Sequence, residues 1–166
     1  AILSQDVHVS AGPLADDLRL ADPDADDADL WDALTRVRAA DWVRALPDGL
    51  DTRIGENGHP LSASQGQQLA LARLVLSDPP VAILDEATAE AGSSGARMLE
   101  EAAAAATEGR TTVIVAHRLT QAASADTIVV LEHGRVVESG THSDLVTADG
   151  RYARLWSAWT GATDVE

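Results

Sequence analysis

Short apolar runs alternate with helical segments through the second half of the chain, and this alternation constrains the fold more than any other feature. The runs at 81–84 and 111–116 are separated by a helical segment at 93–107, and a short helix at 119–124 leads to a third run at 127–131. Strands that alternate with helices predict a parallel sheet with helices on both faces. We therefore expect an α/β fold.

The first half of the chain is expected to be mostly helical. Leu30, Leu34 and Val37 recur at helical spacing within 27–40, and the apolar residues of 62–76 are also spaced for burial on a helix. The remaining expected elements are a strand end at 1–3, a short helix within 7–20, another at 42–46, a loop at 48–60, a hairpin of 127–131 with 135–139 around Gly134, and terminal helices at 141–145 and 152–159.

Composition excludes several classes of function. The chain carries 12 basic and 27 acidic residues, for a net charge of −15, and such an acidic surface repels the phosphates of nucleic acids. It has no cysteine, which excludes disulfides and thiolate sites. The 12 basic residues are all arginine, which excludes a Schiff-base lysine and the lysine of a P-loop. No apolar run reaches the roughly 18 residues of a membrane span.

Two of the predicted strands are followed by residues that could carry chemistry. Asp85 and Glu86 follow the run at 81–84, and His117 follows the run at 111–116. Ligands of α/β sheets bind at the carboxyl ends of strands. One carboxylate could therefore lie near a magnesium ion and the other near a reacting water, while the imidazole could contact a phosphate. The alternative is structural: an acidic strand end that caps the next helix, and a histidine without a catalytic role.

A third candidate lies at the start of the helix predicted at 62–76. Ser62, Ser64 and Gln65 place small polar side chains at a helix N-terminus, where free N–H groups and the helix dipole attract anions. A plain serine N-cap explains the same residues.

Together and in this order, these segments resemble the nucleotide-binding domain of ATP-binding cassette (ABC) transporters. Residues 84–88 resemble the Walker B segment, 116–119 the H-loop with its switch histidine, and 61–65 the LSGGQ signature. Gln5 resembles the Q-loop glutamine, and the likeness extends from there to about Trp156. The segments that resemble the exporter branch are 46–56, 134–142 and 150–152.

The resemblance implies ATP and Mg²⁺ as cofactors and assigns roles to the residues named above. Asp85 would bind magnesium, Glu86 would polarise the attacking water, and His117 would contact the γ-phosphate. Gln5 would sense magnesium and the water and link to the membrane domain. Ser62, Ser64 and Gln65 would act in trans on ATP bound to a second nucleotide-binding domain. The implied place is the cytoplasmic face of the plasma membrane, in a bacterial transporter whose partners do not include nucleic acid.

The family's P-loop and N-terminal sheet have no counterpart in this sequence. We therefore expect the C-terminal portion of a nucleotide-binding domain: a P-loop NTPase-type parallel sheet that lacks its P-loop strand, with a helical signature subdomain at 6–78 and a core of 1–5 and 79–166. In the family the P-loop strand lies beside the strand that ends in the switch histidine. An unpaired edge is therefore expected at 111–116, together with self-association or rearrangement of the chain. Very weak ATP binding and no useful hydrolysis are expected of residues 1–166 alone.

Three departures from the family pattern leave the function of the whole protein open. The two signature glycines are Ala63 and Ser64, the following Arg-Gln-Arg is 66–68 Gly-Gln-Gln, and the D-loop is 89–92 Ala-Glu-Ala-Gly. A domain with intact Glu86 and an altered signature fits an asymmetric heterodimeric exporter, whereas neutral drift in a homodimer is the simpler explanation. The alternative to an energy-coupling ATPase is a degenerate, non-catalytic regulatory or structural domain of a heterodimeric transporter. A soluble cassette ATPase of the chromosome-maintenance or translation type fits the exporter-like segments and acidic charge less well.

Overall fold

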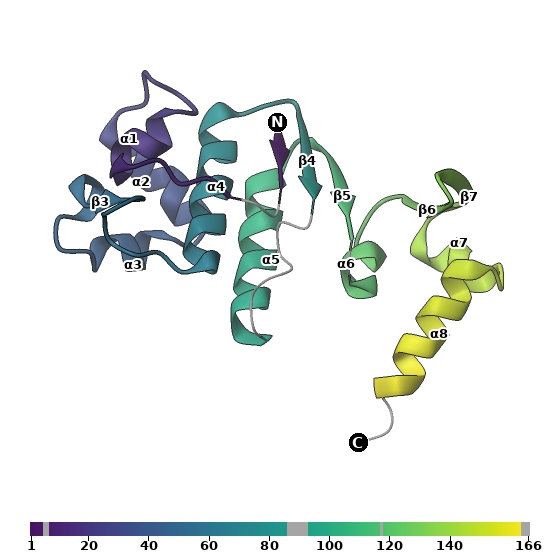
Figure 1. The fold of residues 1–166 in the computed structure, drawn as a ribbon. Coiled ribbons are helices and arrows are strands. Elements are labelled where there is room, and N and C mark those ends of the chain that lie inside the picture. The colour runs from purple at the N-terminus through teal and green to yellow at the C-terminus, as the bar shows by residue number, and fades with distance from the viewer. Residues whose placement is uncertain (5–6, 86–92, 117, 164–166) are drawn as a thin grey trace. The chain divides into compact units, whose positions relative to one another are not determined.

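The computed structural model describes residues 1–4, 7–85, 93–116 and 118–163. The chain forms two compact units, residues 1–115 and 116–166 (Figure 1). The predicted division into subdomains at 6–78 and 79–166 is a different one and stays a prediction.

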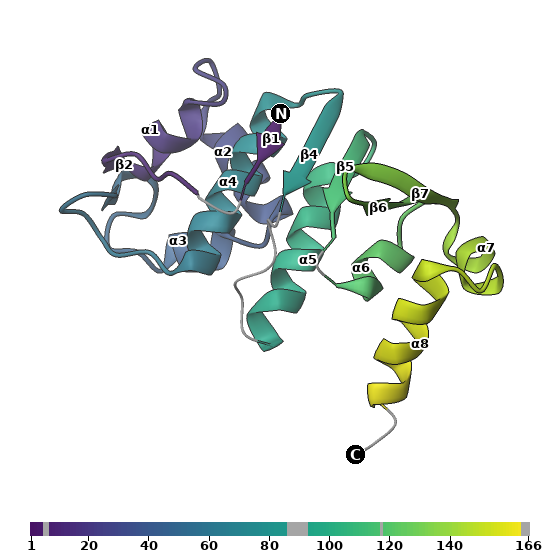
Figure 2. The same ribbon diagram turned by 45° about the vertical axis from the view of Figure 1, so that its right-hand side comes forward.

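The first unit contains a three-stranded parallel sheet in the order β1-β4-β5. The strands are β1 (Ile2–Leu3), β4 (Val81–Asp85) and β5 (Thr111–Val115), and Figure 2 shows them side by side. The chain crosses from β4 to β5 through α5 (Ser93–Thr107), as a parallel pair requires. The predicted α/β fold with a parallel sheet is confirmed.

Helices make up most of the rest of this unit. They are α1 (Leu14–Arg19), α2 (Asp27–Arg36), α3 (Ala40–Arg44) and α4 (Ala63–Ser77), with a 3₁₀ turn at Gly49–Asp51 and a small antiparallel pair of β2 (Gly12–Pro13) with β3 (Arg53–Ile54). The helix predicted at 27–40 is α2, which ends at Arg36, and the short helix predicted at 42–46 is α3, which begins at Ala40. Helix α2 ends early because Arg38 adopts a left-handed backbone conformation with φ of 58°, which no α-helix continues through.

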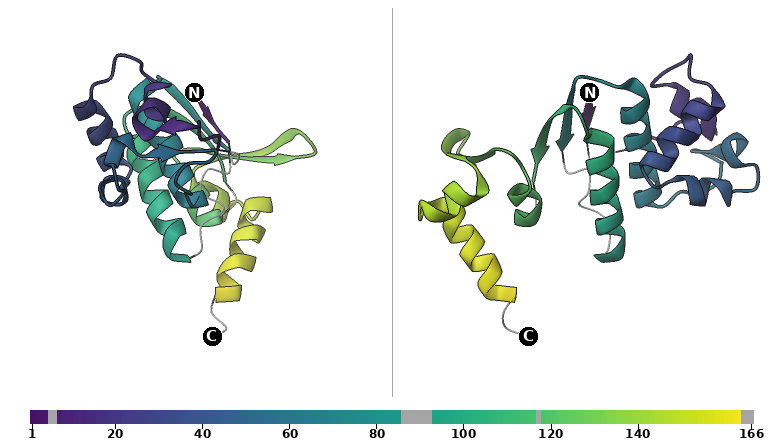
Figure 3. Two further views of the ribbon diagram at one scale, coloured as in Figure 1. Left: turned by 60° about the vertical axis from the view of Figure 1, so that its left-hand side comes forward. Right: turned by 180° about the vertical axis from the view of Figure 1, so that it is seen from behind.

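Helix α4 lies at the centre of the first unit. It contacts α1, α2, α5 and β1, and Figure 3 shows it beside α5. Its residues 66–72 are all buried, so this helix is enclosed on every side rather than amphipathic. The core that surrounds it includes residues from the helices and from the sheet, among them Leu18, Leu34, Leu69 and Leu84.

Strand β5 is an edge strand among the residues that the structure describes, because it pairs only with β4 there. Its side chains are also uncovered: Val113 is 52% exposed and Val115 is 47% exposed. This arrangement agrees with the unpaired apolar edge predicted at 111–116. The described part of the chain has no helix that is long and apolar enough to cross a bilayer.

The second unit is built around a hairpin of β6 (Ile128–Glu132) and β7 (Arg135–Gly140). Its two-residue turn, His133–Gly134, has φ values of 48° and 75°. Two consecutive positive φ angles match the twist of an antiparallel pair, and a glycine at the second position allows them without strain. The hairpin predicted around Gly134 is thus confirmed. The helices are α6 (Leu119–Ala123), α7 (His142–Thr147) and α8 (Arg151–Thr163).

A polar clip holds α8 to β7. The Glu138 carboxylate accepts hydrogen bonds from the backbone N–H groups of Arg151 and Tyr152 at the start of α8, the latter at 3.0 Å. These two bonds favour the ionised form and lower the pKa of Glu138 below its ordinary value. His142 Nδ1 lies 2.8 Å from the Tyr152 hydroxyl, and burial raises the pKa of that hydroxyl.

Candidate functional site

The carboxyl ends of the three parallel strands lie at one edge of the sheet. Leu3 of β1 is in register with Leu84 of β4, and the next residue, Asp85, is in register with Val115 at the end of β5. The Asp85 side chain is exposed at this edge. Three of the predicted site residues, Gln5, Glu86 and His117, lie outside the described residues.

Asp85 is suited to a hard divalent cation. It offers an exposed carboxylate at the carboxyl end of a buried parallel strand, where α/β folds bind their ligands. Magnesium that bridges substrate phosphates commonly takes only one or two protein carboxylates and fills its remaining positions with phosphate oxygens and water. No group of three or more potential metal-ligating side chains occurs among the described residues, so a dedicated protein cage for a metal is not found there.

The start of α4 brings Ser62 and Gln65 together in a reciprocal capping box. The Ser62 hydroxyl accepts from the Gln65 backbone N–H at 3.2 Å, and Gln65 Oε1 accepts from the Ser62 backbone N–H at 2.8 Å. The structure contains the serine N-cap, and it places that cap at the N-terminus of a 15-residue helix. It is therefore compatible both with a plain N-cap and with an anion site at this terminus. The N–H groups of Ala63 and Ser64 belong to the first turn, which has no carbonyl partners within the helix.

Two polar side chains on α4 make contacts that the sequence patterns did not predict. Gln68 is 1% exposed; its Nε2 donates to the carbonyl groups of Val37 and Arg38, and its Oε1 accepts from Trp42 Nε1. Arg73 forms an ion pair with a fully buried Asp17. The only sequence signal for Gln68 is a polar residue at a position whose neighbours on the helix are buried.

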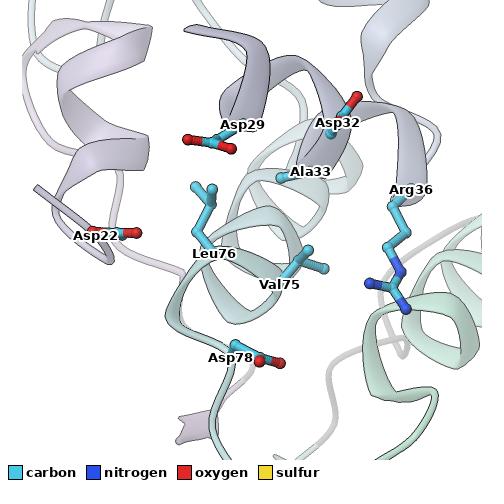
Figure 4. A pocket seen from close by; sticks show the side chains of 8 residues that line it. All are labelled: Asp22, Asp29, Asp32, Ala33, Arg36, Val75, Leu76 and Asp78. Atoms are coloured by element: carbon cyan, nitrogen blue, oxygen red, sulfur yellow. The ribbon is translucent and has the colours of Figure 1, made fainter. Parts of the chain in front are cut away.

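The pocket at the other end of α4 is separate from these residues. It has a volume of about 380 Å³ and lies between α2 and the last turn of α4. Figure 4 shows carboxylates around Val75 and Leu76, and the lining residues are Asp22, Asp29, Asp32, Ala33, Arg36, Val75, Leu76 and Asp78. A 15-residue helix is about 22 Å long, so this acidic pocket lies far from Ser62.

Comparison with known proteins relates this chain to transporters. Residues 1–89 match the family described as ABC transporter. An ATP-dependent lipid A-core flippase of Ralstonia nicotianae is 46% identical over 158 residues, and one of Legionella pneumophila strain Paris is 41% identical over 156. These alignments cover 93% and 94% of this chain but only 27% and 26% of the two relatives. An ABC multidrug transporter, MDR2, of Trichophyton tonsurans is 51% identical over 123 residues, covering 74% of this chain and 9% of the relative.

The chain thus spans about a quarter of the length of the flippases that it matches. The family match covers more than half of the chain and includes both the strand end at Asp85 and the helix that begins after Ser62. The matched relatives carry the names of exporters. The chain therefore belongs to the ABC transporter family, and its sequence is that of an exporter-type nucleotide-binding domain.

Proposed function

We propose that residues 1–166 are the C-terminal part of the ATP-binding and ATP-hydrolysing domain of an ABC exporter, where they couple hydrolysis to transport across the membrane. The observation that supports this most is the register of the parallel sheet. Leu3, Asp85 and Val115 end adjacent strands at one edge. In the sequence, each strand is followed within two residues by a group suited to phosphate chemistry: Gln5, Glu86 or His117.

The proposed roles follow from the charge and hydrogen-bonding capacity of each group. The Asp85 carboxylate would hold Mg²⁺, Glu86 would take the proton of the attacking water, and His117 would donate to the γ-phosphate. Gln5 would sense the magnesium ion and the water and would link to the membrane domain. The magnesium ion would neutralise charge on the phosphates when bound.

The start of α4 serves a second nucleotide-binding domain. Ser62, Ser64 and Gln65 close over ATP bound to that domain, and they do so from a helix N-terminus that favours anions. The partners are thus a second nucleotide-binding domain, the same or different, and a transmembrane domain. The proposed location is the cytoplasmic face of the plasma membrane.

The 166-residue chain alone is expected to bind Mg-ATP very weakly. It has no lysine, so it cannot supply the lysine that grips the β- and γ-phosphates in a P-loop. Isothermal titration of the chain with Mg-ATP should give no heat of binding in the micromolar range. A micromolar dissociation constant would contradict this expectation.

The proposed function is tested in the full-length transporter that contains this chain. Glu86→Gln should abolish steady-state ATP hydrolysis while leaving nucleotide binding in place, because the amide cannot accept the proton of the attacking water. Glu108→Gln is a matched control, because the Glu108 side chain is 78% exposed. Its ion pair with Arg36 is long, at 3.9 Å. Equal ATPase rates in the parent and Glu86→Gln would refute the catalytic role.

A second candidate function is a non-catalytic domain of a heterodimeric transporter. It is favoured by Ala63 and Ser64, whose Cβ atoms stand where the family has glycine and where a phosphate would approach the backbone. In that case the full-length protein with its partner would bind ATP, and Glu86→Gln would leave the hydrolysis rate of the pair unchanged.

A further inference from the structure

The segment that follows Gln5 is held along α4 at two places. At the first, Val7 and Val9 lie over Gly66: a Cβ atom added to Gly66 would be 3.9 Å from a methyl group of each valine. This distance is an ordinary van der Waals contact, so the two methyl groups face the helix at Gly66 and leave room for a Cβ atom there. The 7–10 segment thus has an apolar contact with the second turn of α4.

The second place is a buried ion pair. Arg73 Nη1 donates to both carboxylate oxygens of Asp17 at 3.1 Å, and Arg73 Nη2 donates to the carbonyl oxygen of His8 at 3.0 Å. Asp17 Oδ1 also accepts from the Ser10 backbone N–H at 2.8 Å. The Asp17 side chain is 0% exposed and that of Arg73 is 20% exposed. The pair therefore forms hydrogen bonds with two backbone groups of the 7–10 segment, the His8 carbonyl and the Ser10 N–H.

This geometry requires an arginine and a carboxylate. The guanidinium fork makes two bonds to Asp17 and a third to His8, which a lysine ammonium cannot reproduce in one plane. A buried ion pair costs desolvation and is weak evidence of stability in itself. What the pair does provide is a fixed placement of the two segments that it joins.

We propose that Asp17 and Arg73 are positioning residues that lock the 7–10 segment to α4. This proposal rests on the proposed function, in which Gln5 and the start of α4 both act on bound ATP. Arg73 is 11 residues after Ser62 on the same helix, about 16 Å along a rigid axis. A displacement of the segment after Gln5 is therefore passed to α4, and through the helix to Ser62, Ser64 and Gln65.

The first test uses hydrogen exchange of the 166-residue chain and does not depend on any activity. In Asp17→Asn the side chain keeps its size, but the charge that holds the Arg73 fork is lost. We expect at least about fivefold faster exchange in peptides that cover 7–11, with exchange in α5 unchanged. Asp16→Asn is the matched control, because Asp16 is the exposed neighbour on α1. Unchanged exchange at 7–11 in Asp17→Asn would overturn the lock.

The second test measures ATP hydrolysis by the full-length transporter. Asp17→Asn and Arg73→Gln should each lower kcat by at least about fivefold, with the KM for Mg-ATP within about twofold of the parent, since neither residue touches ATP. The double variant should be no slower than the slower single variant, because both changes break the same ion pair. Additive losses, or an unchanged kcat in both single variants, would overturn the proposal.

The two proposals fail separately. If Glu86→Gln abolishes hydrolysis but Asp17→Asn does not slow it, the proposed function stands and the lock has no functional role. If Glu86→Gln has no effect, the proposed function fails, and the exchange measurement still decides whether the lock exists. If Asp17→Asn exposes the whole unit, with fast exchange in α5 as well, the pair is a general stabilising contact and the positioning role is refuted.

Discussion

Two adjacent glutamines on α4 offer a direct measure of the hydrogen bonds that hold the helical part of the first unit together. Gln67 and Gln68 are 2% and 1% exposed, so both are buried to the same extent. Gln68 makes three hydrogen bonds, to Val37, Arg38 and Trp42, at 3.0–3.1 Å. By contrast, Gln67 Oε1 has no hydrogen-bond partner. Substituting methionine at each position changes the polarity while nearly preserving the volume.

Gln68→Met should destabilise the unit by about 2–4 kcal/mol. Each lost hydrogen bond contributes about 0.5–1.5 kcal/mol, and the buried Val37 carbonyl is left without that partner. The contact also holds Arg38, whose φ of 58° is unfavourable for a residue with a side chain. Gln67→Met should change the stability by less than about 1 kcal/mol, because it removes a buried oxygen that has no partner.

Urea denaturation followed by tryptophan fluorescence measures the difference. With an m-value of about 2 kcal/mol/M, Gln68→Met should lower the midpoint by about 1–2 M, and Gln67→Met by less than about 0.5 M. Trp42 reports locally, because its indole N–H loses its acceptor in the first variant. Equal midpoint shifts in the two variants would refute the assignment of the stability to these hydrogen bonds.

Three further predictions concern other parts of the chain. Gly66→Ala should raise the urea midpoint by the equivalent of about 0.5–1 kcal/mol, because the added Cβ meets Val7 and Val9 only at 3.9 Å and helix interiors disfavour glycine; a lower midpoint would contradict this. The Glu138 pKa is lowered in the folded state, so its stabilising effect is present above the ordinary value of 4.5 and is lost as the pH falls below it. The stability difference between the parent and Glu138→Gln should accordingly shrink on acidification in thermal melts, and a difference independent of pH would argue against the clip. Val113→Lys places a charge on the exposed edge strand β5 and should reduce self-association, which light scattering measures. A parent chain that stays monomeric at high concentration would contradict the expected self-association.

The fold was predictable where local patterns determine it. The helix predicted at 93–107 matches α5, and the runs at 81–84 and 111–116 match β4 and β5 within one residue. The prediction was wrong in the first half at 27–40, where apolar spacing continues through Val37 but the backbone turns at Arg38. That turn is held by Gln68, 30 residues further along the chain, and periodicity within one segment carries no information about such a contact.

The ion pair between Asp17 and Arg73 likewise could not be predicted from the sequence. The two residues are 56 positions apart, and Asp17 lies in an acidic helix start that composition alone would assign to the solvent. The structure instead buries its side chain completely, because a single guanidinium and one backbone N–H satisfy both oxygens. A buried charge is thus identified only once its partner is placed, and this requires the fold.

The start of α4 differs, because its local geometry can be predicted from the sequence. Ser62-Ala63-Ser64-Gln65 has the serine and the glutamine three residues later that form a capping box, and the structure contains that box. The same two side chains are, with Ser64, the ones expected to contact a phosphate. The capping bonds of 3.2 Å and 2.8 Å use the Ser62 hydroxyl oxygen and Gln65 Oε1 only as acceptors. A phosphate can therefore accept from the Ser62 O–H or from Gln65 Nε2 without breaking either bond, just as it can from the N–H groups of Ala63 and Ser64. We expect the two side chains to keep the helix end in place and, at the same time, to donate to a phosphate beside the backbone N–H groups of the first turn.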